Sequence, residues 1–381
     1  MASDDDDWFF DSVKNYRNLF MYDLQHPVTC MDWIDDKNLV VATSSDVRNE
    51  ILELSVPDKL LSDDLESAGL LKDRDFRQKN GGFSTCKICC IKHIPQSRQV
   101  CTSDETNTGI QVWEIGSNGT DLIKPVESFK SQHVDKSNKK CLAKIAVNEN
   151  NPSCIVFGSS LNNLCCLDVE KGNTHEVICD KTEFLETSVI SEIKFMDQNT
   201  LISCCEKSGE IRLIDFREKQ AKADNNRKSN LYPACDTDSY WTMDITVDLV
   251  YRLSSAGSIV ISDVRNGNDS ILQEINTQHQ SKTKDTEISI KAAPQQQQKV
   301  SLSGFDGNVY IYDTQKSPVH EFGYSFTEPI FNHQGHEKNC SDQSDIIKSL
   351  AHLWHPWKPD LIMSSASDGS LHAWEYCIPN T

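Results

Sequence analysis

The chain has 381 residues, of which 38% are hydrophobic and 25% charged, enough apolar material to bury a sizeable core without disulfide staples. Its 38 basic and 57 acidic residues give a net charge of -19, which repels phosphate backbones and argues against direct nucleic-acid binding. The apolar runs are far shorter than the roughly 18 residues of a membrane span, and the start, MASDDDDW, is acidic where a signal peptide is basic. We therefore expect a cytosolic or nuclear protein.

The N-terminal region predicts three successive elements. Residues 1–7, with Asp4, Asp5, Asp6 and Asp7, are expected to form an acidic disordered tip. Residues 8–19 have apolar side chains at helical spacing after acidic N-cap candidates, which predicts a short helix. Residues 19–24 then fit the outermost strand of a closed ring, where the first strand pairs with the last unit and removes an exposed sheet edge.

Seven runs of alternating apolar residues end on an acidic residue, which indicates internal repeats. The successive gaps between these acids are 61, 54, 47, 48, 50 and 62 residues by subtraction, close to the period of about 40–50 residues typical of a propeller blade. The seven acids are Glu53, Glu114, Asp168, Asp215, Asp263, Asp313 and Glu375. The fold class is thus predicted to be all-β, a seven-bladed β-propeller with a short N-terminal helix.

The repeats divide the chain into one domain over residues 8–376, followed by a tail at 377–381. Turn signals support the division, because Asp-Gly pairs at 306–307 and 368–369 each stand between two strand-like runs. The expected blades cover about 25–80, 81–130, 140–182, 187–220, 238–278, 284–330 and 345–376. Residues 57–73 are expected to be an inserted loop.

The 15 cysteines are an odd number in a chain without a secretion signal, which predicts free thiols in a reducing compartment. Cys86, Cys89 and Cys90 lie in a stretch that alternates like a strand, so their side chains do not converge as zinc ligands must. Adjacent cysteines such as Cys165 and Cys166 point to opposite faces of a strand. We expect small apolar core residues here, with no metal and no cofactor.

The last repeat, from QGHEKN (334–339) to SDGSLHAWEY (367–376), resembles the WD-repeat family. The resemblance implies a hydrogen-bonded structural tetrad of His336, Ser364, Asp368 and Trp374, with Ser365 as an alternative to Ser364. Such a network stiffens a blade when every member is satisfied. In the other repeats, residues such as Leu167 and Tyr312 stand where the family has Trp.

Longer segments, among them DDWFFDS, MDWIDDKNLVV and KDRDFRQKNGGFS, resemble one branch of that family, the WD repeat-containing protein 73 family. This resemblance implies a non-enzymatic, cytoplasmic assembly factor that holds the RNA endonuclease subunit of the Integrator complex and its inactive paralogue together and covers the active site. It also implies an association with microtubules, the spindle pole and the cleavage furrow in mitosis. The protein is expected to be monomeric by itself.

Two termini are candidates for the partner contact, because an acidic segment can mimic phosphate in a basic nuclease channel. The first is the acidic N-terminus with Trp8. The second is the C-terminal tail with Cys377 and Pro379, although for Cys377 we favour the explanation that it is one more buried strand thiol. Phe83, Trp241 and Trp357 are further aromatic candidates for anchors, which core packing also explains.

Other function classes remain open at this point. IDFR (214–217) and SDVR (262–265) resemble the end of a box that docks some WD-repeat proteins on a cullin-RING ubiquitin ligase, but both lack Trp. An Arg after a strand-ending Asp is also explained as an exposed ion pair. An enzyme is the weakest alternative, since no phosphate-binding loop or His-Glu metal motif occurs.

Overall fold

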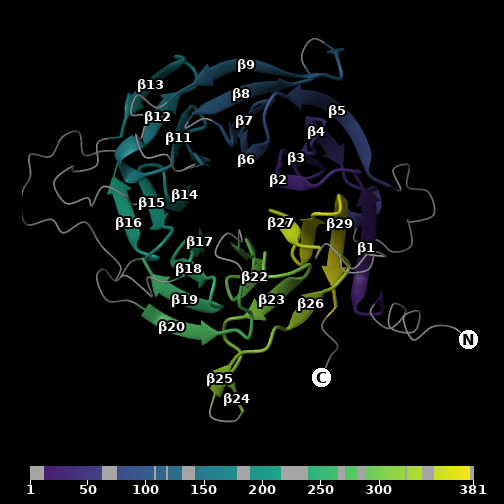
Figure 1. Cartoon of the computed structure of the whole chain (residues 1–381), viewed down its shortest axis with the longest axis vertical. Helices are drawn as coiled ribbons and strands as arrows, with labels where there is room; N and C mark the ends of the chain where they lie inside the picture. The colour runs from purple at the N-terminus through teal and green to yellow at the C-terminus, as the bar shows by residue number, and fades with distance from the viewer. Residues whose placement is uncertain are drawn as a thin grey trace, which may run out of the picture.

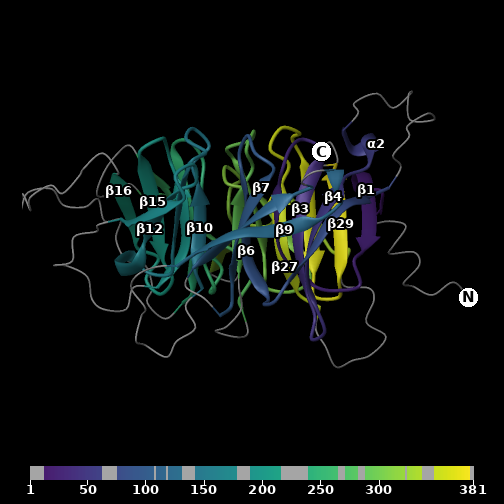
Figure 2. The same ribbon diagram turned by 90° about the horizontal axis from the view of Figure 1, so that it is seen from above.

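The computed structural model of the chain describes residues 13–61, 75–106, 109–116, 119–130, 142–177, 189–215, 239–264, 271–281, 288–321, 324–336 and 347–377. Seven antiparallel sheets stand around a central axis, which confirms the predicted seven-bladed propeller (Figure 1). Seen from the edge, the sheets form a flat disc (Figure 2). Within the described residues, no helix is long and apolar enough to cross a membrane.

The first three blades each contain four strands in chain order from the axis outward. Blade 1 consists of β2 (Val28–Trp33), β3 (Asn38–Ser44), β4 (Asn49–Ser55) and β5 (Arg77–Ser84). Blade 2 consists of β6 (Ile88–Ile94), β7 (Gln99–Asp104), β8 (Ile110–Ile115) and β9 (Ile123–Phe129). Blade 3 consists of β10 (Lys144–Val147), β11 (Cys154–Gly158), β12 (Cys165–Asp168) and β13 (Asn173–Glu176), with a 3-10 turn at Leu161–Asn163.

Blades 4 to 7 complete the ring. Blade 4 has three described strands, β14 (Ile190–Phe195), β15 (Thr200–Cys205) and β16 (Ile211–Asp215). Blade 5 consists of β17 (Trp241–Ile245), β18 (Leu249–Ser254), β19 (Ser258–Asp263) and β20 (Ile271–Asn276). Blade 6 consists of β21 (Ser289–Ala292), β22 (Lys299–Ser303), β23 (Val309–Asp313) and β26 (Phe331–His333). Blade 7 contains β27 (Ser349–Trp354), β28 (Leu361–Ala366) and β29 (Ser370–Tyr376).

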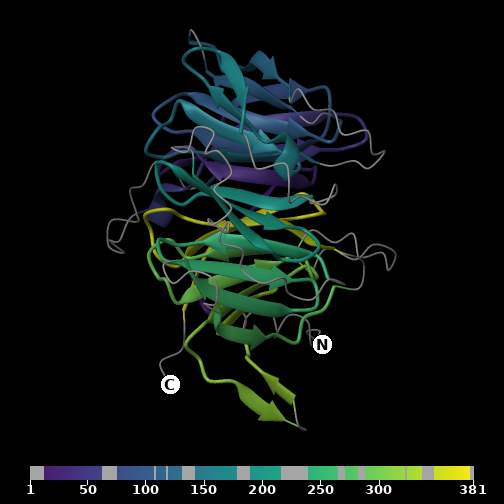
Figure 3. The same ribbon diagram turned by 90° about the vertical axis from the view of Figure 1, so that its left-hand side faces the viewer.

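Two features depart from the regular ring. A small hairpin of β24 (Val319–Glu321) and β25 (Tyr324–Phe326) interrupts blade 6 and projects from the disc (Figures 1 and 3). A short helix, α2 (Asp58–Leu61), lies at the start of the segment that was expected to be a loop. Its Leu60 is buried against the core between blades 7 and 1, and this packing stabilises the helical turn. Residues 62–74 lie outside the described residues.

The core lies between neighbouring blades. In β11, Val156 packs in the cluster shared with blade 4, whereas the next residue, Phe157, packs in the cluster shared with blade 2. Successive side chains of a strand point to opposite faces, so one strand supplies both interfaces. Each such buried side chain contributes roughly 1.5–3 kcal/mol, and no blade can bury both faces alone.

Strand β1 (Tyr16–Asp23) closes the ring by pairing with β29, from Tyr16 opposite Tyr376 to Asp23 opposite Ser370. The predicted helix over 8–19 is therefore wrong for residues 16–19, while Val13 is helical and residues 1–12 lie outside the described residues. The physical reason is tertiary: Tyr16 and Leu19 pack on the cluster around Trp374, which favours the strand over the local helical spacing.

Candidate functional site

A chain of hydrogen bonds crosses blade 7 from Trp374 to Asp368. Trp374 Nε1 donates to Ser364 Oγ (3.0 Å), and Ser364 Oγ lies 2.9 Å from His336 Nε2. His336 Nδ1 lies 2.7 Å from Ser370 Oγ, which donates to Asp368 Oδ1 (2.6 Å). An indole N–H only donates and an ionised carboxylate only accepts, so every bond points from Trp374 towards Asp368. This direction assigns the His336 proton to Nδ1.

The structure thus brings together the four residues of the tetrad expected from the sequence. It adds one member, because Asp368 reaches His336 through Ser370 and not directly. Between the two alternatives, Ser364 holds the position, while Ser365 Oγ donates to the backbone carbonyl of Ala351 at 3.3 Å. Gly369 permits the tight turn with φ of +90°.

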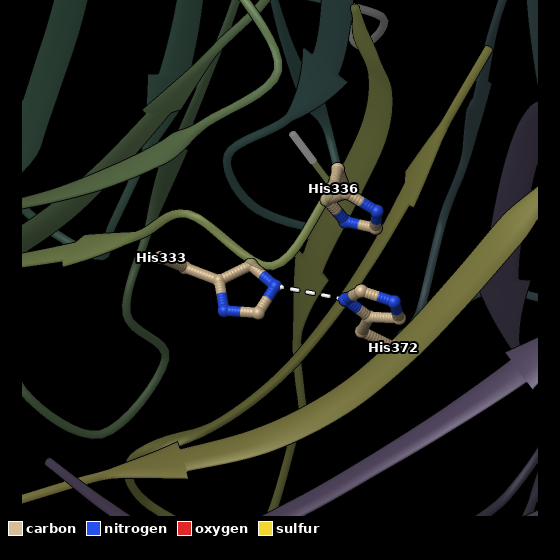
Figure 4. A group of neighbouring side chains, drawn as sticks. All are labelled: His333, His336 and His372. Atoms are coloured by element: carbon tan, nitrogen blue, oxygen red, sulfur yellow. Dashed lines mark hydrogen bonds between the residues drawn. The ribbon is translucent and has the colours of Figure 1, made fainter. Parts of the chain in front are cut away.

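A second arm of the network ties the closing strand to the last two blades. Tyr16 Oη lies 2.8 Å from His333 Nδ1, and His333 Nε2 lies 3.1 Å from His372 Nδ1 (Figure 4). The His372 ring stacks on His336, with centroids 4.0 Å apart and planes 9° apart. Tyr16 comes from β1, His333 from β26 of blade 6, and His372 from β29. The network therefore joins three segments that are remote in sequence.

The three histidines also form a group with metal-ligand chemistry, since their ligand atoms lie within 4.8 Å of one another. Their orientation does not suit a metal ion. The lone pairs of an imidazole lie in the plane of its ring, so the parallel rings of His336 and His372 direct them along parallel planes that do not converge. Both nitrogens of His336 already face serine hydroxyls. We conclude that the group is a structural latch.

Burial keeps the latch uncharged at neutral pH. It lowers the pKa of His372 to about 4, and it lowers the pKa values of His333 and His336 well below the usual range, with neighbouring imidazoles adding to the effect. All three side chains are at most 3% exposed. Neutral imidazoles can act as both donor and acceptor, which the two arms of the network require.

Comparison with known proteins identifies the family of the chain. No protein-family model matches it. The chain is 31% identical, over 390 aligned residues, to the Integrator complex assembly factor WDR73 of Danio rerio, covering 98% of this chain and 97% of that relative. It is 30% identical to the protein of the same name in Xenopus laevis (96% of each) and 28% identical to that of Homo sapiens (98% of this chain, 99% of the relative). The chain belongs to the WDR73 family.

The resemblance drawn from segments such as NGGFS is therefore confirmed, and the structure explains that segment. A Cβ added at Gly82 would lie 2.3 Å from the carbonyl oxygen of Ile123 in blade 2, so the outer strand of blade 1 lies directly on the neighbouring backbone. Asn80 donates to the Glu53 carboxylate. In this WDR73-family chain, the segment joins two blades.

The residues expected to touch a partner are only partly described. Asp4, Asp5, Asp6, Asp7, Trp8 and Pro379 lie outside the described residues. Cys377 is half-buried beyond the end of β29, and its backbone N–H donates to the carbonyl of Asn15 (2.8 Å). Asn15 and Cys377 of this WDR73-family chain therefore lie side by side at one edge of blade 7.

The aromatic candidates for anchors separate clearly. Trp241 is 2% exposed within the core between blades 4 and 5, so it is not an anchor. Phe83 and Trp357 are 70% and 58% exposed, on the outer strand of blade 1 and on a turn of blade 7. Large exposed aromatic side chains of this kind are typical of interface anchors. Arg217 and Arg265, the ends of the two ligase-like segments, lie outside the described residues.

Charged side chains from the inner strands interact near the axis. Lys92 Nζ lies 3.9 Å from the Asp32 carboxylate, and Lys194 pairs with Asp244. Burial lowers the pKa of Lys291, and the nearby Lys194 lowers it further. In this acidic WDR73-family chain, lysines of the inner strands thus pair with inner-strand acids.

Proposed function

We propose that this chain is a non-enzymatic, cytoplasmic assembly factor of the Integrator complex that stabilises the RNA endonuclease subunit together with its inactive paralogue and covers the nuclease active site. The observation that carries the proposal is the similarity along 96–98% of the chain to relatives named as Integrator complex assembly factors. A similarity of that length covers nearly the whole chain and reaches every blade.

Electrostatics supports the covering role. A nuclease that holds RNA needs a basic channel, and a partner with a net charge of -19 meets such a channel with complementary potential. The acidic run at residues 4–7 is the densest negative segment of the chain. Complementary charge of this kind speeds association and orients the partners. The binding should therefore weaken as salt rises.

The joined ends of the chain support a contact at one edge. Asn15 and Cys377 are hydrogen-bonded, so these two residues, one near each end of the sequence, lie side by side on blade 7. One partner surface can thus meet both of them. The exposed Trp357 lies on the turn between β27 and β28 of the same blade and offers an apolar anchor.

The first test is affinity purification of the tagged chain from separate cytosolic and nuclear extracts, with quantitative mass spectrometry at two salt concentrations. We expect the Integrator endonuclease and its paralogue from cytosol, in lower yield at high salt. Recovery of tubulin or spindle-pole factors without these subunits would instead support the cytoskeletal alternative. Recovery of a cullin adaptor alone would support the ligase alternative.

Charge-matched variants locate the contact. Changing residues 4–7 to Asn should reduce recovery of the endonuclease severalfold, because the complementary charge is lost. The control removes the same number of charges at exposed sites on other blades, with Asp46→Asn, Asp121→Asn, Glu149→Gln and Glu170→Gln. Equal losses in both variants would show that total charge matters and not the N-terminus. In a nuclease assay, inhibition that survives truncation of both termini would contradict the hypothesis that a terminus covers the active site.

A further inference from the structure

Two thiols of blade 3 are in direct contact. Cys154 Sγ lies 3.3 Å from Cys166 Sγ, and the two residues come from the adjacent antiparallel strands β11 and β12. They are diagonal neighbours, because Cys166 pairs with Val156 and Cys154 pairs with Asp168. A disulfide requires about 2.05 Å between the sulfurs, so the two sulfurs must approach each other by about 1.3 Å more to form the bond.

The two thiols have different surroundings. Cys154 is half-buried and follows an exposed turn at residues 149–151, whereas Cys166 is 5% exposed within the cluster between blades 3 and 4. The hydrogen bond from Cys166 lowers the pKa of Cys154, and the same contact, together with burial, raises the pKa of Cys166. Cys154 is therefore the thiol that both reaches solvent and carries the thiolate more readily.

The neighbouring thiol is kept apart from this pair. Cys165 lies on the opposite face of β12 and packs in the cluster between blades 2 and 3. Adjacent residues of a strand point to opposite sides, as the sequence predicted for the Cys165–Cys166 pair. Oxidation of the cysteines in blade 3 should therefore join Cys154 to Cys166 and leave Cys165 out.

We propose that Cys154 and Cys166 form a redox-sensitive dithiol, which hydrogen peroxide converts to a disulfide bond that a dithiol reductant reopens. The Cys154 thiolate attacks one oxygen of the peroxide, the O–O bond breaks, and Cys154 becomes a sulfenic acid. The hydroxide that leaves takes up the proton that the Cys154 thiol released and becomes the first water. The Cys166 sulfur then attacks the Cys154 sulfur, the S–O bond breaks, and the departing hydroxyl takes the Cys166 proton and leaves as the second water. Two thiols and one peroxide thus yield one disulfide and two waters. This modification site is independent of the proposed assembly role.

The test uses the purified full-length chain, reduced and then exposed to limiting hydrogen peroxide. We expect the intact mass to fall by two hydrogen atoms and to recover with dithiothreitol. Trypsin leaves Cys154, Cys165 and Cys166 on one peptide, residues 145–171, so further cleavage at Phe157 and Leu164 is needed to separate Cys154 from the other two. The disulfide should link the fragment containing Cys154 to the fragment that begins at Cys165.

Serine variants distinguish the partners. The Cys165→Ser variant should form the bond as the unmodified chain does, whereas Cys154→Ser and Cys166→Ser should not. With oxidised glutathione, the Cys166→Ser variant should accumulate a mixed disulfide at Cys154. Each variant is first compared with the unmodified chain by circular dichroism, so that loss of the fold is not mistaken for loss of the bond. Cys205→Ser, at a half-buried thiol of blade 4, is the control.

The proposal is overturned if peroxide leaves Cys154 and Cys166 reduced while other cysteines oxidise. It is also overturned if the bond persists in the Cys166→Ser variant, since Cys154 would then have another partner. A Cys154–Cys166 disulfide that forms only after urea unfolding would overturn it as well, because the contact between the two sulfurs in the folded chain would then be a packing contact only.

Discussion

Glu53 of blade 1 and Arg98 of blade 2 form a two-pronged ion pair, with Arg98 Nη1 and Nη2 each 2.8 Å from a Glu53 carboxylate oxygen. The carboxylate is 1% exposed, while the guanidinium is about half exposed at the rim. Hydrogen bonding to Glu53 raises the pKa of Arg98. One of the seven repeat-marking acids thus fastens its blade to the next.

Removing the Arg98 side chain should lower the free energy of unfolding more than removing the charge of Glu53. Arg98→Ala leaves the buried Glu53 carboxylate with Asn80 as its remaining partner and should destabilise the fold by about 2–3 kcal/mol. Glu53→Gln keeps a hydrogen-bonding group of the same shape and should lose less. Urea unfolding followed by circular dichroism measures both. Equal losses would show that the pair acts through its charge alone.

The tetrad should be most sensitive at Ser364, which serves two partners. Ser364→Ala removes the acceptor of Trp374 Nε1 and the donor to His336, leaving two buried polar groups unsatisfied. We expect a loss of about 2–4 kcal/mol in the free energy of unfolding. Ser365→Ala is the matched control on the same strand, because Ser365 makes only long bonds of 3.3 and 3.5 Å to backbone carbonyls. A control loss as large as that of Ser364→Ala would contradict the network.

The histidine latch predicts a pH dependence with a definite sign. The folded-state pKa of His372 is lowered from 6.5 to about 4, so the unfolded chain binds the proton first as the pH falls. The contribution of His372 to the free energy of unfolding is fully present above about pH 6.5. The free energy of unfolding should decline from there towards pH 4, by about 1 kcal/mol per pH unit for each such histidine.

Urea midpoints between pH 7.5 and 5 measure this slope. His372→Asn should be less stable at pH 7.5 and should show a shallower decline, because one titrating group is gone. His175→Asn, at an exposed position on blade 3, should leave the slope unchanged. A slope that is the same in all three proteins would assign the pH dependence to groups outside the latch.

Adjacent glycines of the NGG segment should respond differently to alanine. Gly82→Ala places a methyl group 2.3 Å from the Ile123 carbonyl oxygen, so blades 1 and 2 must separate, at a cost of about 1–3 kcal/mol. Gly81→Ala meets the flexible side chain of Gln78 at 3.0 Å, which can move away. Thermal unfolding should therefore show a clear loss for the first variant and little change for the second. The reverse order would refute the close backbone approach.

The repeats made the fold predictable from the sequence. Each blade has its own strand-ending acid, so the blades can be located and counted from local patterns, without knowing which residues touch across the fold. The contacts between blades have no such signal. Arg98 follows Glu53 by 45 residues, and no spacing rule connects an arginine in a turn to an acid in the preceding blade. The helix predicted for residues 8–19 failed in its second half for the same reason, since β29 pairs with that segment from the far end of the chain.

The candidate site was predictable where a motif carried it. The family pattern led to His336, Ser364, Asp368 and Trp374, but it left out Ser370, through which Asp368 reaches His336. Ser370 was visible as the residue after the Asp-Gly turn, where its hydroxyl can bond back to Asp368. Tyr16 and His333 belong to other segments and carry no pattern that links them to the last blade.

The pairing of β1 with β29 has a consequence during synthesis. The strand that ends at Asp23 is complete early, but its partner begins at Ser370, so the ribosome must add 347 residues (370 minus 23) before the ring can close. At about 5–20 residues per second, this takes roughly 20–70 s. Throughout that interval the first strand has an open edge and an apolar face, and nascent-chain chaperones have time to bind it. The newborn chain therefore exposes this edge until almost the whole sequence has been made.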